Sequence, residues 1–213
     1  MSIAFMAVVT SSMAQSLNKM NWLNEPQQWE IKDGKTLVMD VPAKTDFWRI
    51  SHYGFTVDDG PFYYATYGGE FEAKVKITGN YVTTFDQMGL MLRIDHENWI
   101  KAGVEYVDGK QNVSAVVTHR TSDWSVVQLP DAPRSIWIKA VRRLDAVEIF
   151  FSRDDKEYIM MRTCWLQDNC PVMVGLMGAC PDGKGFTAIF EDFKVTPLAD
   201  QRRLEWAKKQ MKK

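Results

Sequence analysis

Residues 89–105 read Gly89-Leu90-Met91-Leu92-Arg93-Ile94-Asp95, then His96-Glu97-Asn98, then Trp99-Ile100-Lys101-Ala102-Gly103-Val104-Glu105. In both outer runs apolar side chains alternate with polar or small ones, and this period of two is typical of β-strands with one buried face. The middle three residues fit a tight turn, so the stretch predicts an antiparallel hairpin. One face of the hairpin must be core, and we expect it to carry Leu90, Leu92, Ile94, Ile100, Ala102 and Val104.

The same alternation recurs along the chain from Trp29 onward, whereas helical periodicity is nearly absent before residue 197. Turn residues such as Asp33-Gly34 and Asp108-Gly109 separate the apolar runs. So many strands require two packed sheets, because one small open sheet could not hold them. We expect strands near residues 29–31, 36–41, 62–67, 70–78, 87–94, 99–106, 112–118, 125–129, 135–142, 146–152, 158–163, 172–177 and 187–195.

The size and composition of the chain fit one all-β domain. Its 213 residues are 46% hydrophobic and 25% charged, which is ordinary for a globular protein and excludes general disorder. We expect an N-terminal extension at residues 1–20, a β-sandwich domain at 21–196 and a short basic C-terminal helix at 197–213. In that helix Leu204, Ala207 and Met211 fall at helical spacing, so it would dock on the domain or bind an acidic partner or membrane surface.

The charge of the chain bears on its partners. The formal net charge is −1, so no overall field would draw nucleic acid, and we expect no nucleic-acid partner. Six basic side chains and Glu205 give residues 201–213 a net charge of +5, which leaves −6 for the residues before them. No segment is long and apolar enough to span a bilayer, so no integral membrane association is expected. The oligomeric state stays open.

The cysteines and the N-terminus bear on the compartment. Cys164, Cys170 and Cys180 form neither an even set nor a Cys-x-x-Cys pair, so we expect reduced thiols in a cytoplasmic protein. The alternative is export, with residues 1–14 as a signal remnant and one bridge, Cys164–Cys170 or Cys170–Cys180. Residues 3–9 are apolar and Ser12-Met13-Ala14 resembles a cleavage site, but the run is short and lacks a basic segment ahead of it.

The second face of the predicted hairpin carries polar groups. Charges of both signs around an indole suit a polyhydroxylated ligand, because they hydrogen-bond hydroxyls while the ring stacks on the C–H face of a sugar. The register of the next strand is ambiguous by one residue, so either His119 or Arg120 would join this face. The alternative is a solvent-facing side with ion pairs worth under about 1 kcal/mol each. If Asp95 lies opposite Trp99, the face carries Arg93, Asp95, Trp99, Lys101 and Glu105, with Gly89 and Gly103 leaving room between them.

Aromatic residues near probable loops extend this candidate site. Trp48 follows Phe47, Tyr64 lies in the run 62–64, and Trp124 lies in the run 122–125. Aromatic side chains at loops often line pockets. We therefore expect a rim made of Trp48, Tyr64, His119 and Trp124.

Several motifs together resemble the concanavalin A-like proteins grouped with the fungal regulator of enolase expression, over roughly residues 21–195. The resemblance implies a concanavalin A-like jelly-roll sandwich of two antiparallel sheets, and a family whose biochemical activity is largely undefined. The motifs are Thr45-Asp46-Phe47-Trp48, His52-Tyr53-Gly54, the stretch 89–105, Ser122-Asp123-Trp124-Ser125, Trp137-Ile138-Lys139 and Gly178-Ala179-Cys180-Pro181.

Relatives with this fold that cleave glycans use a Glu-x-Asp-x-x-Glu run on one strand, and this chain has none. No phosphate-binding glycine loop is present and the histidines stand alone, so no catalytic residue, metal or cofactor is expected. We therefore expect a carbohydrate or small polar-ligand binding protein, with a regulatory role in carbohydrate metabolism. Two alternatives stay open: a glycoside hydrolase or lyase-like enzyme in which Asp95 or Glu105 works with His119 or Lys101, and a regulatory or interaction protein with no small-molecule site.

Overall fold

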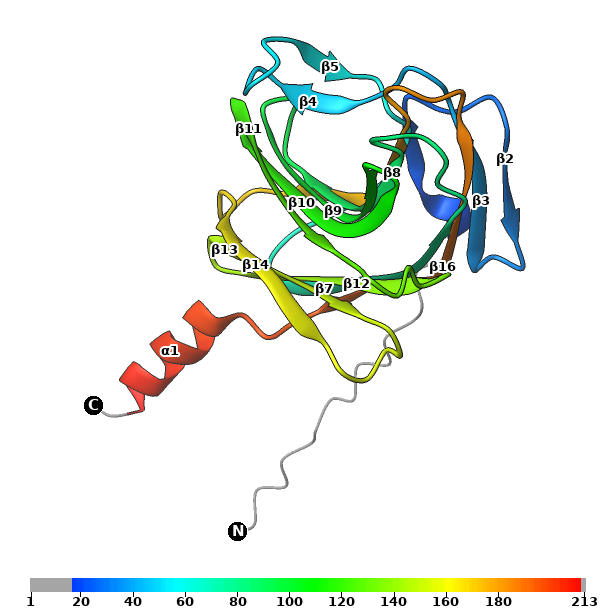
Figure 1. Ribbon diagram of the computed structural model, residues 1–213. Coiled ribbons are helices and arrows are strands. Elements are labelled where there is room, and N and C mark those ends of the chain that lie inside the picture. The colour runs from blue at the N-terminus through cyan, green and yellow to red at the C-terminus, as the bar shows by residue number, and fades with distance from the viewer. Residues whose placement is uncertain (1–16, 212–213) are drawn as a thin grey trace.

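Two seven-stranded antiparallel sheets pack face to face in the computed structural model, which describes residues 17–211 (Figure 1). Sheet 1 has the order β1 (Asn21–Leu23), β6 (Phe62–Tyr67), β15 (Val172–Ala179), β8 (Gln87–Arg93), β9 (Asn98–Val107), β10 (Lys110–His119) and β11 (Thr121–Gln128). Sheet 2 has the order β14 (Ile159–Trp165), β13 (Ala146–Ser152), β12 (Ile136–Arg143), β7 (Phe71–Gly79), β16 (Phe186–Pro197), β3 (Thr36–Val41) and β2 (Trp29–Lys32). A separate hairpin joins β4 (Phe47–Arg49) to β5 (Thr56–Asp58). The predicted two-sheet antiparallel sandwich with a short C-terminal helix is confirmed.

Every predicted strand overlaps an observed one, because the alternation that predicts a strand is the alternation that buries one of its faces. In β7, for example, Phe71, Ala73, Val75 and Ile77 are buried and the residues between them are partly exposed. The strands β1, β4 and β5 were not predicted. Each has only three residues, which is too short for a period of two to stand out.

The hairpin of β8 and β9 has the predicted core face but a different register. Leu90, Leu92, Ile100 and Val104 are buried between the sheets. Arg93 pairs with Trp99, however, and Gly89 pairs with Gly103, each two residues away from the predicted pairing. A slip of two residues keeps every side chain on its face, so alternation alone cannot detect it.

Asp95 causes the difference in register. Its Oδ1 accepts hydrogen bonds from the backbone N–H groups of Glu97 (2.8 Å) and Asn98 (2.9 Å). This local turn, in which an aspartate caps the following backbone, ends β8 at Arg93. Asp95 is thereby removed from the sheet face on which it was predicted to lie.

Gly89 and Gly103 serve the packing of the two strands and do not open room for a ligand, which corrects the prediction. A Cβ atom on Gly103 would lie 1.9 Å from the carbonyl oxygen of Met88, and one on Gly89 would lie 2.0 Å from that of Ala102. Both values are far below van der Waals contact. The absence of side chains therefore lets β8 and β9 approach each other closely.

The predicted C-terminal helix is observed as α1 (Gln201–Gln210), whose first turn is capped by the Asp200 side chain. Leu204 is 48% exposed and Met211 is 87% exposed. Figure 1 shows α1 extending away from the sandwich, so these apolar side chains of the helix are not buried by docking. No helix among residues 17–211 is long and apolar enough to cross a membrane.

The apolar run at residues 3–9 and the cleavage-like residues 12–14 lie outside the described residues. From residue 17 onward the chain contributes to the core, since Leu17 is 1% exposed and the hydroxyl of Tyr63 donates to its carbonyl oxygen. Cys164, Cys170 and Cys180 are all free in this structure. No group of three or more His, Cys, Asp or Glu among the described residues is placed to hold a metal ion.

Candidate functional site

The hairpin of β4 and β5 lies across the outward face of sheet 1, above strands that curve beneath it (Figure 1). Phe47 packs edge-on against Trp99, with ring centroids 6.2 Å apart. Trp99 is consequently only 1% exposed. The indole that was predicted to stack on a sugar is instead the centre of a second, smaller hydrophobic core under the hairpin.

Ion pairs fix the position of this hairpin on sheet 1. Arg93 is 5% exposed, and its guanidinium donates two hydrogen bonds to the carboxylate of Asp58, at 2.5 and 2.6 Å. Arg49 pairs with Glu97 at 2.6 Å, and its backbone N–H donates to the hydroxyl of Ser122. Bidentate arginine–carboxylate pairs are geometrically specific, so Arg93 positions the hairpin and is not available to a ligand.

The hairpin leaves part of the face open as a cavity of about 310 Å³. This volume is at the small end of ligand-binding cavities in proteins. Its walls come from the β4–β5 hairpin and the residues beside it, from β8 to β11, and from the loop after β15. The lining residues are Asp46, Trp48, Tyr53, Phe55, Phe85, Gln87, Lys101, Glu105, Val116, Trp124, Pro181 and Asp182.

Lys101 lies in this cavity and is 4% exposed. Its Nζ donates to the carbonyl oxygen of Phe47 at 2.7 Å and lies 3.4 Å from Asp46 Oδ1. The same Asp46 oxygen accepts from the backbone N–H of Phe47 at 2.7 Å and from Gln87 Nε2 at 3.4 Å. Lys101 is therefore fixed by the chain segment that begins the hairpin.

Glu105 lies four residues further along β9, on the same face, and is 5% exposed. Its Oε2 accepts hydrogen bonds from Ser114 Oγ at 2.6 Å and Trp124 Nε1 at 2.8 Å. Burial raises the pKa of Glu105, against the opposing effects of the charge on Lys101 and of these two hydrogen bonds. The cavity thus contains a carboxyl group whose pKa depends on burial and on the groups around it.

Substitution of Glu105 by glutamine is expected to stabilise the empty protein at pH 8. The folded-state pKa of Glu105 lies above its unfolded value, so its favourable contribution is complete below the unfolded pKa and is lost as the pH rises through the folded pKa. Glutamine keeps an acceptor for Ser114 and Trp124 but carries no charge. Removing a buried charge of this kind gains about 1 kcal/mol, or about 2–4 °C in Tm for a chain of this size. Thermal unfolding at pH 4 and pH 8 checks this, and an equal or lower Tm for Glu105→Gln at pH 8 would contradict it.

Aromatic rings form the rest of the cavity wall. Trp48 donates from Nε1 to the carbonyl oxygen of Ser51 at 2.9 Å and meets Tyr53 edge-on, with centroids 5.6 Å apart. Tyr53 stacks on Phe55 at 5.6 Å. On the opposite side, Phe85, which precedes β8, meets Trp124 of β11 edge-on, with ring centroids 6.3 Å apart. A ligand in the cavity would contact both ring faces and charged groups.

The structure brings together only part of the predicted site. Lys101, Glu105, Trp48 and Trp124 line the cavity. Tyr64 does not, because its ring stacks on Phe62 at 5.1 Å beside the hairpin core.

His119 also lies elsewhere: its Nε2 is 3.0 Å from the carbonyl oxygen of Trp165 and its ring meets that indole edge-on. Neither His119 nor Arg120 lies opposite Trp99, because Thr118 occupies that position. Of the groups named for the enzyme alternative, Asp95 lies in the turn and His119 lies outside the cavity, whereas Lys101 and Glu105 both line it.

Other lining residues were missed by sequence reasoning. Gln87 lies two residues before Gly89 on the same face, so extending the alternation by one step would have found it. Asp46 and Phe85 lie outside the main strands, and Tyr53 and Phe55 lie between β4 and β5. Nothing in their spacing connects them to β9. Asp46, Tyr53 and Phe55 lie more than 40 residues before β9 in the sequence, and only the tertiary fold brings them to it.

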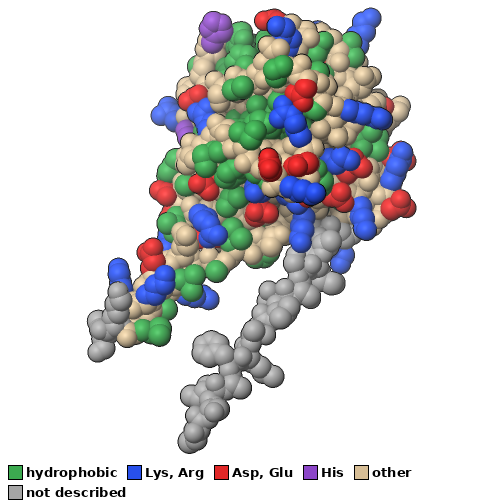
Figure 2. All heavy atoms as spheres, turned by 60° about the horizontal axis from the view of Figure 1, so that its bottom comes forward, with side chains coloured by type: hydrophobic (Ala, Val, Ile, Leu, Met, Phe, Trp, Pro, Cys, Tyr) green, Lys and Arg blue, Asp and Glu red, His purple; other side chains and the backbone are tan. Residues whose placement is uncertain are grey.

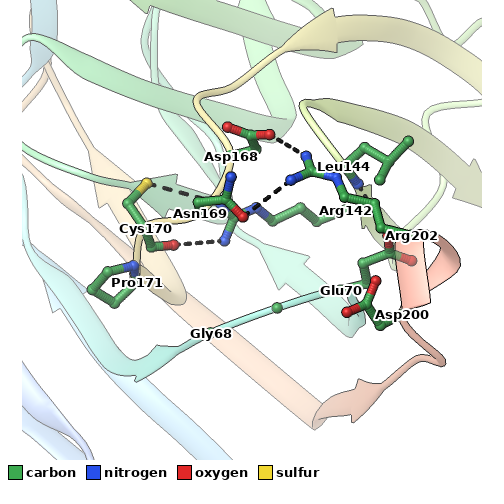
Figure 3. Close-up of a pocket in the computed structure, with 11 residues that line it drawn as sticks. Gly68, Glu70, Arg142, Leu144, Asp168, Asn169, Cys170, Pro171, Asp200 and Arg202 are labelled. Carbon is green, nitrogen blue, oxygen red and sulfur yellow. Dashed lines mark hydrogen bonds and ion pairs between the residues drawn. The ribbon is translucent and has the colours of Figure 1, made fainter. Parts of the chain in front are cut away.

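A second cavity of about 380 Å³ lies between the loop before β15 and the start of α1, and Figure 3 shows that its polar groups pair with one another. Arg142 is 2% exposed and donates to the carbonyl oxygens of Gln167 (2.8 Å) and Cys170 (3.1 Å). Arg202 pairs with Asp168 and donates to Asn169. These contacts tie the loop and the helix to the sandwich, and this cavity is the weaker candidate.

The outward face of sheet 2 has the mixed charge of a solvated surface. Figure 2 shows Lys and Arg interspersed with Asp and Glu on the side turned forward, and Lys74–Asp155 (2.8 Å) and Lys76–Glu191 (3.1 Å) pair there. A solvent-facing side with ion pairs was the alternative considered for the polar face of β8 and β9. That description fits the outward face of sheet 2 instead.

Structural relatives share the sandwich. A carbohydrate binding module, CBM66 from Bacillus subtilis, has a TM-score of 0.53 at 14% identity, covering 84% of this chain and 98% of that one. A xylan beta-1,4-xylosidase from Bacillus halodurans C-125 has a TM-score of 0.65 at 13% identity, covering 86% of this chain and 38% of that one. At such identities the likeness shows the fold alone.

Two matches at higher identity come from Saccharomyces cerevisiae. The crystal structure of a functionally unknown protein has a TM-score of 0.82 at 33% identity, covering 87% of this chain and all of that one. The protein "Regulation of enolase protein 1" is 33% identical over 188 residues, which are 88% of this chain and 94% of that protein. Residues 22–198 match the family described as "Protein of unknown function (DUF1349)". The resemblance read from the motifs is thereby confirmed, and this chain belongs to that family.

Proposed function

We propose that the cavity between the β4–β5 hairpin and sheet 1 binds a small polar ligand of the carbohydrate class. The observation that carries the proposal is the meeting, in about 310 Å³, of the indole rings of Trp48 and Trp124 with the charged groups of Lys101 and Glu105. Sugars have apolar C–H faces that pack on aromatic rings and hydroxyls that hydrogen-bond to charged groups. The fold shared with a carbohydrate binding module supports the same class of ligand.

The test is a binding panel of mono- and disaccharides measured by thermal shift and calorimetry. Trp124→Ala is expected to weaken binding at least tenfold. It removes one ring of the cavity wall and the Nε1–H group that donates a hydrogen bond to Glu105. Trp165→Ala is the matched control, since that indole is 51% exposed and lies outside the cavity. Equal affinity in both variants, or no saccharide binding by the folded wild type, would contradict the proposal.

The regulatory role in carbohydrate metabolism is a wider form of this proposal. Its support is the relationship to "Regulation of enolase protein 1". It requires the ligand-bound and empty proteins to differ in a downstream effect. Comparing the enolase level in cells that carry the wild type or Trp124→Ala tests it, and an unchanged enolase level would count against it.

A further inference from the structure

The charge of the cavity walls restricts the ligand further. Among the described residues, three carboxylates line the cavity, those of Asp46, Glu105 and Asp182, against one ammonium group, that of Lys101. The surplus is negative, and part of it is buried, where water screens charges least. An anionic sugar would therefore enter against repulsion.

Lys101 does not offset this by presenting a free cation. Its side chain is 5% exposed, and its Nζ is engaged by the Phe47 carbonyl oxygen and the Asp46 carboxylate. Its charge is accordingly balanced inside the wall. An incoming anion would have to compete with Asp46 for it.

Glu105 can accept more hydrogen bonds than the protein donates to it. The described residues donate both of its hydrogen bonds to Oε2 and none to Oε1, although the residue is 5% exposed and lines the cavity. Oε1 is not among the buried atoms that lack a partner, so it is accessible from the cavity and can accept a hydrogen bond from a ligand. A charged donor supplies the strongest such hydrogen bond.

The aromatic wall favours the same kind of ligand. Trp48, Tyr53, Phe55, Phe85 and Trp124 line the cavity around these carboxylates. The faces of aromatic rings attract cations, and indole does so most strongly. Ring faces and carboxylates therefore act together on a positively charged group.

We propose that the ligand is an aminated carbohydrate whose protonated amine binds Glu105 Oε1, an inference that rests on the proposed function. The hydroxyl-bearing ring would pack between Trp48 and Trp124. An N-acetylated or neutral sugar of the same configuration lacks the charge that the cavity is built to receive.

Binding of the amine is expected to lower the pKa of Glu105. In the empty site burial raises the pKa of Glu105, and an ammonium group beside it would lower that pKa. The other titratable groups around Glu105 are Lys101 on the same strand, Asp46 before β4, Tyr53 in the β4–β5 loop and Asp182 after β15. Ser114 on β10 and Trp124 on β11 contribute neutral donors. Affinity for the amine should therefore rise with pH until the amine itself loses its proton.

The experiment uses matched sets of sugars: glucose, glucosamine and N-acetylglucosamine, with the same three forms of galactose and mannose. At least one free amino sugar is expected to bind the wild type at least tenfold more tightly than its neutral and N-acetylated counterparts. Glu105→Gln should remove that preference, whereas Glu157→Gln, which removes an exposed charge outside the cavity, should keep it. Calorimetry in buffers of different ionisation enthalpy measures any protons exchanged on binding, and affinities at pH 6 and pH 8 measure the pH dependence without any variant.

The outcomes separate this inference from the function on which it rests. Binding of neutral, N-acetylated or acidic sugars with no preference for the amine overturns the inference and leaves carbohydrate binding intact. Absence of binding by all sugars, aminated or not, overturns both. A preference for the amine that survives Glu105→Gln in a folded sample overturns the role assigned to Glu105.

Discussion

Substitution of Gly103 by alanine is expected to destabilise the sandwich by about 3 kcal/mol or more. The new Cβ would lie 1.9 Å from the carbonyl oxygen of Met88 and 2.7 Å from the Cα of Gly89. Both are backbone atoms, so no side-chain rotation relieves the overlap and β8 must move away from β9. These strands carry Lys101 and Glu105 on one face and core residues on the other, so the damage would reach both.

Urea-induced unfolding measures this effect. Gly68→Ala is the matched control, because nothing lies within 4 Å of the Cβ that it adds. It should change the free energy of unfolding by less than about 0.5 kcal/mol. If Gly103→Ala were as stable as that control, β8 and β9 would not lie as close as the structure has them.

Trp99→Ala is expected to cost about 3–5 kcal/mol, the usual effect of removing a buried large aromatic side chain. Trp99 is 1% exposed and supports Phe47, which anchors the β4–β5 hairpin on sheet 1. Its Nε1 has no hydrogen-bond partner among the described residues, so the loss would come from packing and from the Lys101 ammonium group, which lies 5.8 Å from the ring centroid. Trp99→Phe should recover part of the stability.

The unfolding midpoints of these variants distinguish a packing role for Trp99 from a ligand-binding role. A Trp99→Ala protein with wild-type stability but no saccharide binding would show that the indole stacks on ligand, as the alternation in β9 first indicated. Loss of stability, with the Phe variant between the alanine variant and the wild type, supports the structure.

The features that could be predicted from the sequence are those that depend on residues close together in the chain. Burial of one strand face imposes a period of two on neighbouring residues, so the strands and the core positions of β8 and β9 could be read from the sequence. Cross-strand register could not, because a slip of two residues preserves that period while the turn at Asp95 sets the pairing.

The site was predicted in part for the same reason. Lys101 and Glu105 lie on the face that alternation assigned to them, and both line the cavity. The β4–β5 hairpin covers Trp99 and Arg93. Its strands have three residues each and pair only with each other, so the sequence did not predict them. The position of that hairpin is fixed by Phe47 and by the Arg93–Asp58 pair, and contacts between distant segments leave no periodic trace in the sequence.

The indole N–H signals in a proton–nitrogen correlation spectrum give the most direct test that this cavity binds ligand. The chain has eight tryptophans, of which Trp48 and Trp124 line the cavity. Glucosamine, with glucose as a second titrant, is expected to shift the signals of Trp48 and Trp124 in a saturable way and to leave those of Trp137 and Trp165 unchanged. Saturable shifts confined to Trp137 or Trp165, or no shift of Trp48 and Trp124 up to high millimolar concentration of both sugars, would contradict the account.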